Sequence, residues 1–215
     1  MSDKIAVLCP TRDGVGGTHR AYTSMLQTSE STTMIVCADD DQRDDYDALS
    51  PAPRMRFSFG PQADIARAVN RGVSENPDFD AYGLIVDDAE FTAPSWDVYV
   101  TRKLESFPRR VGVVSAAHTL GAFVNFGYVS KRWIDTLGWY ACPDTQHYCW
   151  DTVLEMLGEA TEIDYAPRET FYIQHNHVPK DKTLPVFMMD AVQFLGWCVN
   201  KRRETVMKLR EAAIA

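Results

Sequence analysis

The stretch YGLIVDDAEFTAPSW, residues 82–96, holds the residues whose types and spacing most directly indicate chemistry. An apolar run typical of a buried strand ends in the adjacent carboxylates Asp87 and Asp88, and Glu90 follows two positions later. Adjacent like charges repel each other, and carboxylates at the edge of a core lose hydration. A divalent cation, a sugar or ribose hydroxyl, or bulk water would offset that cost. Only the first two indicate a function.

Two other predicted strands also end in polar residues. The strand at residues 4–10 is followed by Thr11 and Arg12, and the strand at residues 32–41 ends in three aspartates beginning at Asp39. Ligands of open α/β sheets bind beyond the carboxyl ends of the parallel strands. We therefore expect the three strand ends to converge on one rim and to share a ligand. For ADDDQRDD alone, a solvated turn is the alternative.

The elements that position these residues alternate along the chain. Runs rich in Val and Ile predict buried strands at residues 4–10, 32–41, 83–88 and 110–117, as in a parallel sheet. Helical patterns lie between them at residues 19–28, 63–74 and 96–106. This alternation predicts an α/β fold in which helices sandwich a mixed sheet. We expect one domain over residues 1–183, divided near residue 117 into a nucleotide-binding half and a less regular acceptor half.

The composition bounds the class of protein. The chain has 215 residues and a formal net charge of −8, so its charge does not support a nucleic-acid acceptor, although it leaves one open. Its five cysteines are scattered, which indicates reduced thiols rather than disulfides. We find neither a leader peptide nor an apolar run long enough to span a bilayer, and we therefore expect a cytoplasmic protein.

The glycine-rich stretch RDGVGGTHR, residues 12–20, follows the first strand. It has neither the GxxxxGK[ST] spacing with its lysine nor the GxGxxG spacing of known phosphate loops. We interpret it as a flexible loop that joins strand to helix, with a phosphate cradle as the lesser alternative.

Residues 4–183 resemble the GT-A-fold nucleotide-sugar glycosyltransferases, in particular the inverting class called family 2. CPTRDG is similar to the family's opening IPTYN element, and LIVDDAEFTAPSW to its acidic signature. ARAVNRGV is similar to its Asn-x-Gly helix, although Val69 replaces a common arginine and Ala89 replaces a third aspartate. The nucleotide-binding residues that the resemblance implies are Pro10, Thr11, Arg12, Asp39, Arg67, Asn70, Asp87 and Asp88.

The resemblance also implies a Mn²⁺ or Mg²⁺ ion, which hard oxygen ligands suit. We expect Asp88 to bind the metal and Asp87 to bind the donor's ribose or sugar. A late histidine would complete the site, and the segment YIQHNHV offers His175 and His177. The sequence leaves open which of the two is the ligand, and two surface histidines are the alternative.

The general base that an inverting transferase needs is expected at Asp151. The segment HYCWDTVLEML resembles the family's Glu–Asp element, with Trp150 in place of the glutamate. Asp151 would begin an amphipathic helix, whose N-terminus favours an ionised carboxylate. The alternative is an aspartate that only complements the helix dipole.

A long amphipathic helix is expected at residues 184–215, packed on the domain. We predict that it buries a set of apolar side chains, with an oligomer contact or an acceptor-protein contact as the alternative. This set is Val186, Phe187, Met189, Val192, Phe194, Leu195 and Val199.

These expectations amount to a metal-dependent glycosyltransferase that moves a sugar from a nucleotide diphosphate-sugar to an acceptor hydroxyl. The family favours a UDP-sugar and inversion at the anomeric carbon. Two other classes remain open, a nucleotidyltransferase and a non-catalytic module that binds nucleotide-sugars or glycans. The identity of the sugar and of the acceptor is not encoded in these motifs.

Overall fold

The computed structural model describes residues 4–49, 52–119, 124–176 and 184–215. Its centre is a seven-stranded sheet in the order β3-β2-β1-β4-β8-β6-β9. Parallel pairing joins β1 to β2 and β4, β2 to β3, and β6 to β9, whereas β8 runs antiparallel to β4 and β6. The strands are β1 (Ile5–Pro10), β2 (Thr33–Asp39), β3 (Met55–Gly60), β4 (Ala81–Leu84), β6 (Val113–Ser115), β8 (Gly127–Ser130) and β9 (Ile163–Tyr165).

A second sheet of three strands, in the order β5-β10-β7, adjoins the first. Its strands are β5 (Ala89–Phe91), β7 (Ala117–His118) and β10 (Tyr172–His175). β10 runs antiparallel to β5, and His175 lies opposite Ala89 in this register. The small sheet therefore brings His175 next to the acidic turn that precedes β5.

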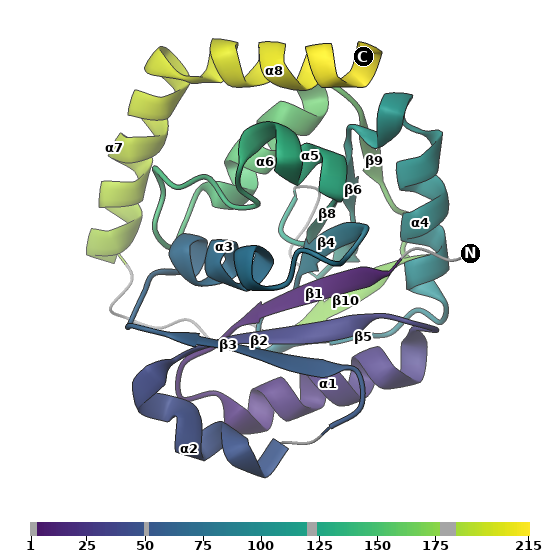
Figure 1. Cartoon of the computed structure of the whole chain (residues 1–215), viewed down its shortest axis with the longest axis vertical. Helices are drawn as coiled ribbons and strands as arrows, with labels where there is room; N and C mark the ends of the chain where they lie inside the picture. The colour runs from purple at the N-terminus through teal and green to yellow at the C-terminus, as the bar shows by residue number, and fades with distance from the viewer. Residues whose placement is uncertain (1–3, 50–51, 120–123, 177–183) are drawn as a thin grey trace.

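Helices cover both faces of the large sheet, and α1 and α3 lie on opposite sides of its parallel strands (Figure 1). This arrangement confirms the predicted α/β class, with a mixed sheet between helices. The helices are α1 (Val15–Thr28), α2 (Arg43–Tyr46), α3 (Ile65–Glu75), α4 (Trp96–Ser106), α5 (Lys131–Leu137), α6 (Trp150–Ala160), α7 (Leu184–Asn200) and α8 (Arg202–Ile214). Single 3₁₀ turns are η1 (Asp40–Gln42), η2 (Asp47–Leu49) and η3 (Pro108–Arg110).

Aromatic stacking fixes the small sheet to the rest of the core. Trp96, at the start of α4, stacks on Phe91 of β5 with ring centroids 4.5 Å apart. The same indole stacks on Phe171, just before β10, at 5.1 Å. Trp96 is fully buried, and such offset pairs stabilise a core beyond the area they bury. The strands that carry the acidic turn and His175 are thus packed on one side chain.

The third predicted strand is shorter than expected. We predicted a strand over residues 83–88, but β4 ends at Leu84, and Asp87 and Asp88 occupy a turn that leads into β5. The turn frees both side chains from the alternation of a strand. The two aspartates therefore lie in the short connection between the large sheet and the small one.

The C-terminal segment forms two helices instead of the single one expected. α7 runs along one side of the molecule, and α8 crosses its end against α5, α6 and η3 (Figure 1). The predicted burial of the α7 side chains is wrong for Phe187, Met189, Val192, Leu195 and Val199, which are exposed. Val186 and Phe194 are half-buried. The physical reason is that α7 turns its narrow Asp190–Trp197 face to the domain, and these two residues are buried.

No helix within the described ranges has both the length and the apolar character needed to cross a bilayer.

Candidate active site

The carboxyl ends of β1, β2 and β4 meet, as the sequence predicted. The Thr11 hydroxyl donates a 2.7 Å hydrogen bond to Oδ2 of Asp87, which joins the ends of β1 and β4. The Arg12 guanidinium forms an ion pair with Asp39 at the end of β2, and a second one with Asp41 at 3.1 Å. These contacts place the polar residues of three strands on one rim.

The glycine-rich segment packs directly on Asp87. A Cβ atom at Gly14 would lie 1.9 Å from Oδ2 of Asp87, and one at Gly17 would lie 2.2 Å from its main-chain oxygen. Gly16 and Gly17 belong to the first turn of α1, so the loop is shorter than we expected and ends at Gly14. The two glycines let the helix start approach the acidic turn closely.

Asp39 is nearly buried, and both of its carboxylate oxygens have partners. Oδ1 accepts a hydrogen bond of 3.2 Å from the Ala63 amide, and Oδ2 pairs with Arg12. Thr11 also lies 2.9 Å from the Tyr46 hydroxyl, which sequence analysis did not single out. Pro10 closes β1 opposite Cys37. The region expected to hold the nucleotide base is therefore a preformed network.

Asp88, the second aspartate of the turn, pairs with His175 of β10. Nε2 of His175 lies 3.1 Å from Oδ1 of Asp88, and the Asn176 amide donates a 2.9 Å bond to the Asp88 main-chain oxygen. The side chain of Asp88 is 37% exposed and that of His175 is 13% exposed. Within the described ranges, no group of three or more His, Cys, Asp and Glu side chains converges. His177, the other candidate ligand, lies outside the described residues.

Asn70 and Arg67 both lie on α3 but have different surroundings. The Asn70 amide group binds the backbone of the segment before α6: its Oδ1 accepts from Tyr140 and Ala141, and its Nδ2 donates to Ala141. Arg67 is exposed and pairs with Asp64 at 3.3 Å. It lines a hollow of about 370 Å³ between α3 and α7. The hydrogen bonds and the ion pair of these two side chains therefore go to residues outside the strand-end network.

Asp151 lies in the first turn of α6, as predicted. Its Oδ1 accepts a 2.8 Å hydrogen bond from the Thr152 amide. Burial of the carboxyl group raises the pKa of Asp151, and the hydrogen bonds from Thr152 only partly oppose this shift. The helix start therefore does not hold this carboxyl at an ordinary pKa. Cys149, which precedes the helix, has a φ of 64°, a left-handed conformation that is costly for a residue other than glycine.

Sequence analysis missed Asp190 of α7, which is fully buried. Its carboxylate accepts backbone hydrogen bonds from residues 146–148, just before α6. The available signal was weak: Asp190 is the single charged residue in the sequence from 184 to 200.

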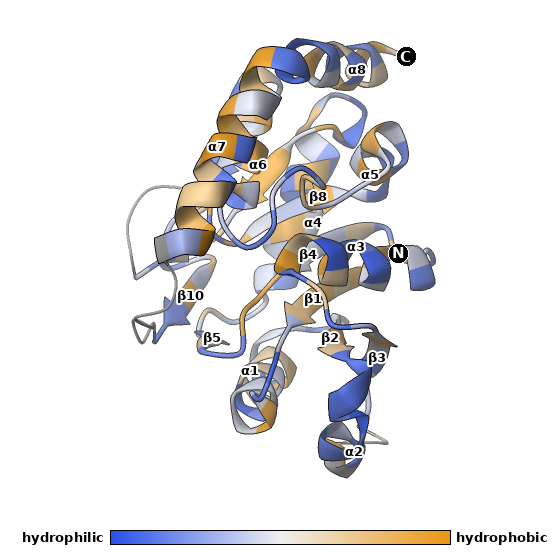
Figure 2. Ribbon diagram, turned by 90° about the vertical axis from the view of Figure 1, so that its left-hand side faces the viewer, coloured by the Kyte–Doolittle hydropathy of each residue, from blue (hydrophilic) through white to orange (hydrophobic). Residues whose placement is uncertain are grey.

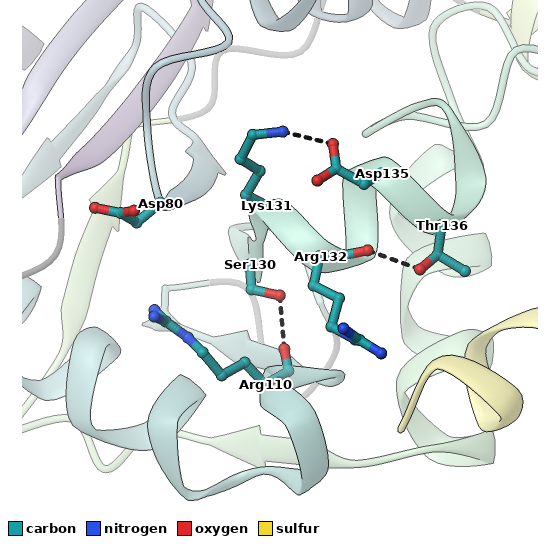
Figure 3. A pocket seen from close by; sticks show the side chains of 7 residues that line it. All are labelled: Asp80, Arg110, Ser130, Lys131, Arg132, Asp135 and Thr136. Carbon is teal, nitrogen blue, oxygen red and sulfur yellow. Dashed lines mark hydrogen bonds and ion pairs between the residues drawn. The ribbon is translucent and has the colours of Figure 1, made fainter. Parts of the chain in front are cut away.

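A second hollow lies at the opposite edge of the large sheet. Figure 3 shows this hollow of about 510 Å³, lined by Asp80, Arg110, Ser130, Lys131, Arg132, Asp135 and Thr136. Asp80 immediately precedes β4, whereas the acidic turn follows it. Lys131 is paired with Asp135 at 2.6 Å. This hollow is therefore separate from the strand-end network.

Comparisons with known proteins support the fold alone. No family model and no curated protein matches the sequence. Among solved structures, the chain is similar to the mannosyltransferase PcManGT from Pyrobaculum calidifontis in complex with GDP-Man and Mn²⁺. The TM-score is 0.67 at 12% sequence identity, and the match covers 99% of this chain and 74% of that one. The chain thus shares a Rossmann-related α/β fold with this mannosyltransferase.

Proposed function

We propose that the protein is a metal-dependent glycosyltransferase that moves a sugar from a nucleotide diphosphate-sugar to an acceptor hydroxyl, with inversion. The observation that carries the proposal is the pair of Asp88 and His175 beside Asp87, at the rim where three strands end. In folds of this type, that rim is where nucleotide ligands bind. Residues 1–117 would bind the donor, and residues 118–183 would supply the acceptor side.

The side chains at the acidic turn suit a divalent cation. A carboxylate oxygen and an imidazole nitrogen lie 3.1 Å apart, and Mn²⁺ accepts both kinds of ligand. Asp88 and His175 would hold the ion, and Asp87 would bind a ribose or sugar hydroxyl. When bound, the ion would neutralise charge on the diphosphate leaving group as a Lewis acid.

Asp151 is our candidate for the general base. It comes from the second half of the chain, whereas Asp87 and Asp88 come from the first. Its carboxylate would accept the proton of the acceptor hydroxyl as that oxygen attacks the anomeric carbon from the side opposite the diphosphate. Burial raises the pKa of Asp151, which makes the carboxylate a stronger base than an exposed aspartate.

The proposal leaves the nucleoside of the sugar donor open between uridine and guanosine. The family resemblance favours uridine, whereas the structurally similar mannosyltransferase was solved with GDP-Man. Arg12 and Asp39 would bind the base, since their ion pair closes the edge beside Thr11. A test therefore has to include both UDP-sugars and GDP-sugars.

The proposal is tested by hydrolysis and transfer assays with a panel of nucleotide-sugars and Mn²⁺. We expect release of a nucleoside diphosphate from one donor, at a rate that falls on the order of a hundredfold in the Asp88→Asn variant. Asp135→Asn, an exposed aspartate of α5, is the matched control and should keep full activity. Pyrophosphate exchange without diphosphate release would indicate a nucleotidyltransferase instead. Donor binding by calorimetry without any turnover would indicate a binding module.

A further inference from the structure

Asp190 holds the chain segment that leads to Asp151. Its carboxylate accepts hydrogen bonds from three successive backbone amides, those of Gln146 and His147 at 2.8 Å and that of Tyr148 at 2.6 Å. Asp190 is fully buried, and a buried carboxylate is tolerated when several donors bind it. Three residues after Tyr148, the chain reaches Asp151.

The other end of this segment is held from a different helix. Asn70 of α3 makes three hydrogen bonds with the backbone of Tyr140 and Ala141. At the second attachment, the Ala66 amide of α3 also donates to the Gln146 main-chain oxygen at 3.1 Å. Residues 140 and 141 are thus attached to α3, and residues 146–148 are attached mainly to α7, with one further bond from α3 at Gln146.

We propose that Asp190 is a positioning residue for Asp151, so that α7 sets the place of the base. This inference rests on the proposed function, in which Asp151 takes the acceptor proton. Cys149 is held at a positive φ between the anchored amides and the helix. Such a conformation persists only when its surroundings impose it, and the anchored amides of 146–148 precede it directly. Asp190 acts on the acceptor side of the reaction and does not touch the donor.

The structural half of the proposal is tested by amide hydrogen exchange at residues 146–148. In Asp190→Asn, an amide nitrogen replaces one acceptor oxygen, and we expect exchange of these amides to rise at least tenfold. Asp97→Asn is the matched control, because Asp97 is also buried and also accepts backbone amides, from Glu30 and Ser31. The control should leave exchange at residues 146–148 unchanged. Unchanged exchange in Asp190→Asn would overturn the proposal, and this readout needs no activity.

The functional half is tested by transfer kinetics of the single and double variants. Asp190→Asn should lower kcat for transfer about tenfold or more while leaving the KM of the donor unchanged. In the Asp151→Asn background, Asp190→Asn should cause no further loss, because the base whose position it would disturb is already missing. Equal losses in both backgrounds would reduce Asp190 to a general structural role. Normal transfer by Asp151→Asn alone would instead refute the assignment of the base.

A separate observation concerns the outer face of α7. Met188, Val192, Leu195 and Val199 are 56%, 67%, 62% and 84% exposed, and their spacing of four, three and four residues is that of a coiled-coil seam. Asp190 and Trp197 are buried against the domain, whereas the seam residues are exposed. Figure 2 shows α7 along one edge of the molecule, with apolar residues over much of its length. Gly196, beside the seam, has open space at its Cβ position.

We infer that this seam pairs with the same seam of a second copy of the chain. Phe187 and Met189 flank it and are also nearly half exposed. At roughly 150–200 Å² for a fully exposed large side chain, the six present on the order of 600 Å². This approaches the ~800 Å² per partner of a standard interface and lies at the upper end of the roughly 300–600 Å² of the largest apolar patch on a typical monomer. The sequence of α7 holds one charge, at Asp190 on the inner face, so two copies meet without repulsion at the seam.

Analytical ultracentrifugation at micromolar concentrations tests the pairing. We expect a dimer for the unmodified chain and a monomer for the Val192→Glu, Leu195→Glu double variant, whose sites are exposed and should not affect folding. Met207→Glu on α8, 48% exposed and off the seam, is the matched control and should remain dimeric. A monomeric unmodified chain would overturn the inference. Flotation of that monomer with phosphatidylcholine vesicles, lost in the double variant, would assign the face to a lipid surface instead.

Discussion

The hydroxyl of Thr11 donates a 2.7 Å hydrogen bond to the carboxylate of Asp87, across 76 residues of sequence. This bond connects the end of the first strand to the acidic turn. It orients one oxygen of Asp87, because Oδ2 is the atom that accepts. The position of the Asp87 carboxylate therefore depends on a side chain outside the turn itself.

Replacing Thr11 by valine should weaken donor binding without unfolding the chain. Valine keeps the shape of the side chain but removes the hydroxyl that donates to Asp87. Hydrogen bonds to charged groups contribute about 1.5–3 kcal/mol. We expect the KM of the nucleotide-sugar to rise at least about tenfold. Thr23→Val on α1 is the control, since its hydroxyl donates to the His19 main-chain oxygen within the same helix. Equal KM values for the Thr11 and Thr23 variants would contradict this role of Thr11.

Alanine substitutions at the three glycines of residues 14–17 should give opposite results. Gly14→Ala and Gly17→Ala place a methyl group against Asp87, and overpacking of this kind costs typically about 1–3 kcal/mol. Gly16→Ala meets only the end of Arg20 at 3.9 Å, and alanine stabilises a helix by about 0.5–1 kcal/mol over glycine. Urea unfolding should show the difference in sign. A stable Gly14→Ala variant with normal donor affinity would disprove the close packing on Asp87.

The acidic limb of the transfer rate should report Asp151. A general base works in its ionised form, and burial raises the pKa of this carboxyl. The limb should therefore have its midpoint above the ordinary aspartate value of about 3.9. A pH profile of kcat measures this limb. Donor hydrolysis by the Asp151→Asn variant should lack it, and a profile that is unchanged in the variant would assign the limb to another group.

The same pKa shift has a consequence for stability. The pKa of the Asp151 carboxyl is higher in the folded state than in the unfolded state, so its ionisation lowers the free energy of unfolding. This loss of stability is present at neutral pH and vanishes in acid, where the carboxyl is protonated in both states. Asp151→Asn should thus unfold at an equal or higher temperature than the unmodified chain at pH 7. The advantage should shrink as the pH falls. Calorimetry at pH 7 and pH 4 checks both statements.

His175→Ala should weaken Mn²⁺ binding while sparing the fold. Its Nε2 lies beside Asp88, where both side chains would bind the ion. Loss of a residue that ligates the metal or orients a ligand lowers metal affinity by at least about tenfold. His147→Ala is the control, because His147 is exposed and its main chain is bound by Asp190 of α7 rather than by the acidic turn. Calorimetric titration with Mn²⁺ and a nucleoside diphosphate measures the difference. Unchanged affinity in His175→Ala would remove this residue from the site.

The elements that could be predicted from sequence are those whose limits are local. α4 occupies residues 96–106 as predicted, because Pro94 and Ser95 precede it and Pro108 follows it. β3 was not predicted. Its Phe57 and Phe59 stack on each other at 5.5 Å, and Arg43 of α2 covers Phe59 at 4.2 Å. The β3 residues MRFSF alternate apolar and polar side chains, so a short period-2 signal for this strand was present in the sequence, whereas its contacts with α2 were not.

Some contacts of the candidate site could likewise be predicted from sequence, and others could not. The meeting of Thr11, Asp39 and Asp87 followed from a rule about the ends of parallel strands, so it could be predicted. The attachment at Asp190 could not, because its partners are backbone amides of residues 146–148. Backbone amides occur at nearly every position and carry no residue signature. The burial that raises the pKa of Asp151 likewise depends on tertiary packing.

The register that sets His175 opposite Ala89 has a consequence in time. His175 follows Asp88 by 87 residues, whereas β1, β2 and β4 are complete by residue 84. At a synthesis rate of about 5–20 residues per second, roughly 4 to 17 seconds separate the emergence of the two side chains. We therefore expect the nascent chain to present its acidic turn well before the imidazole that pairs with it has been made.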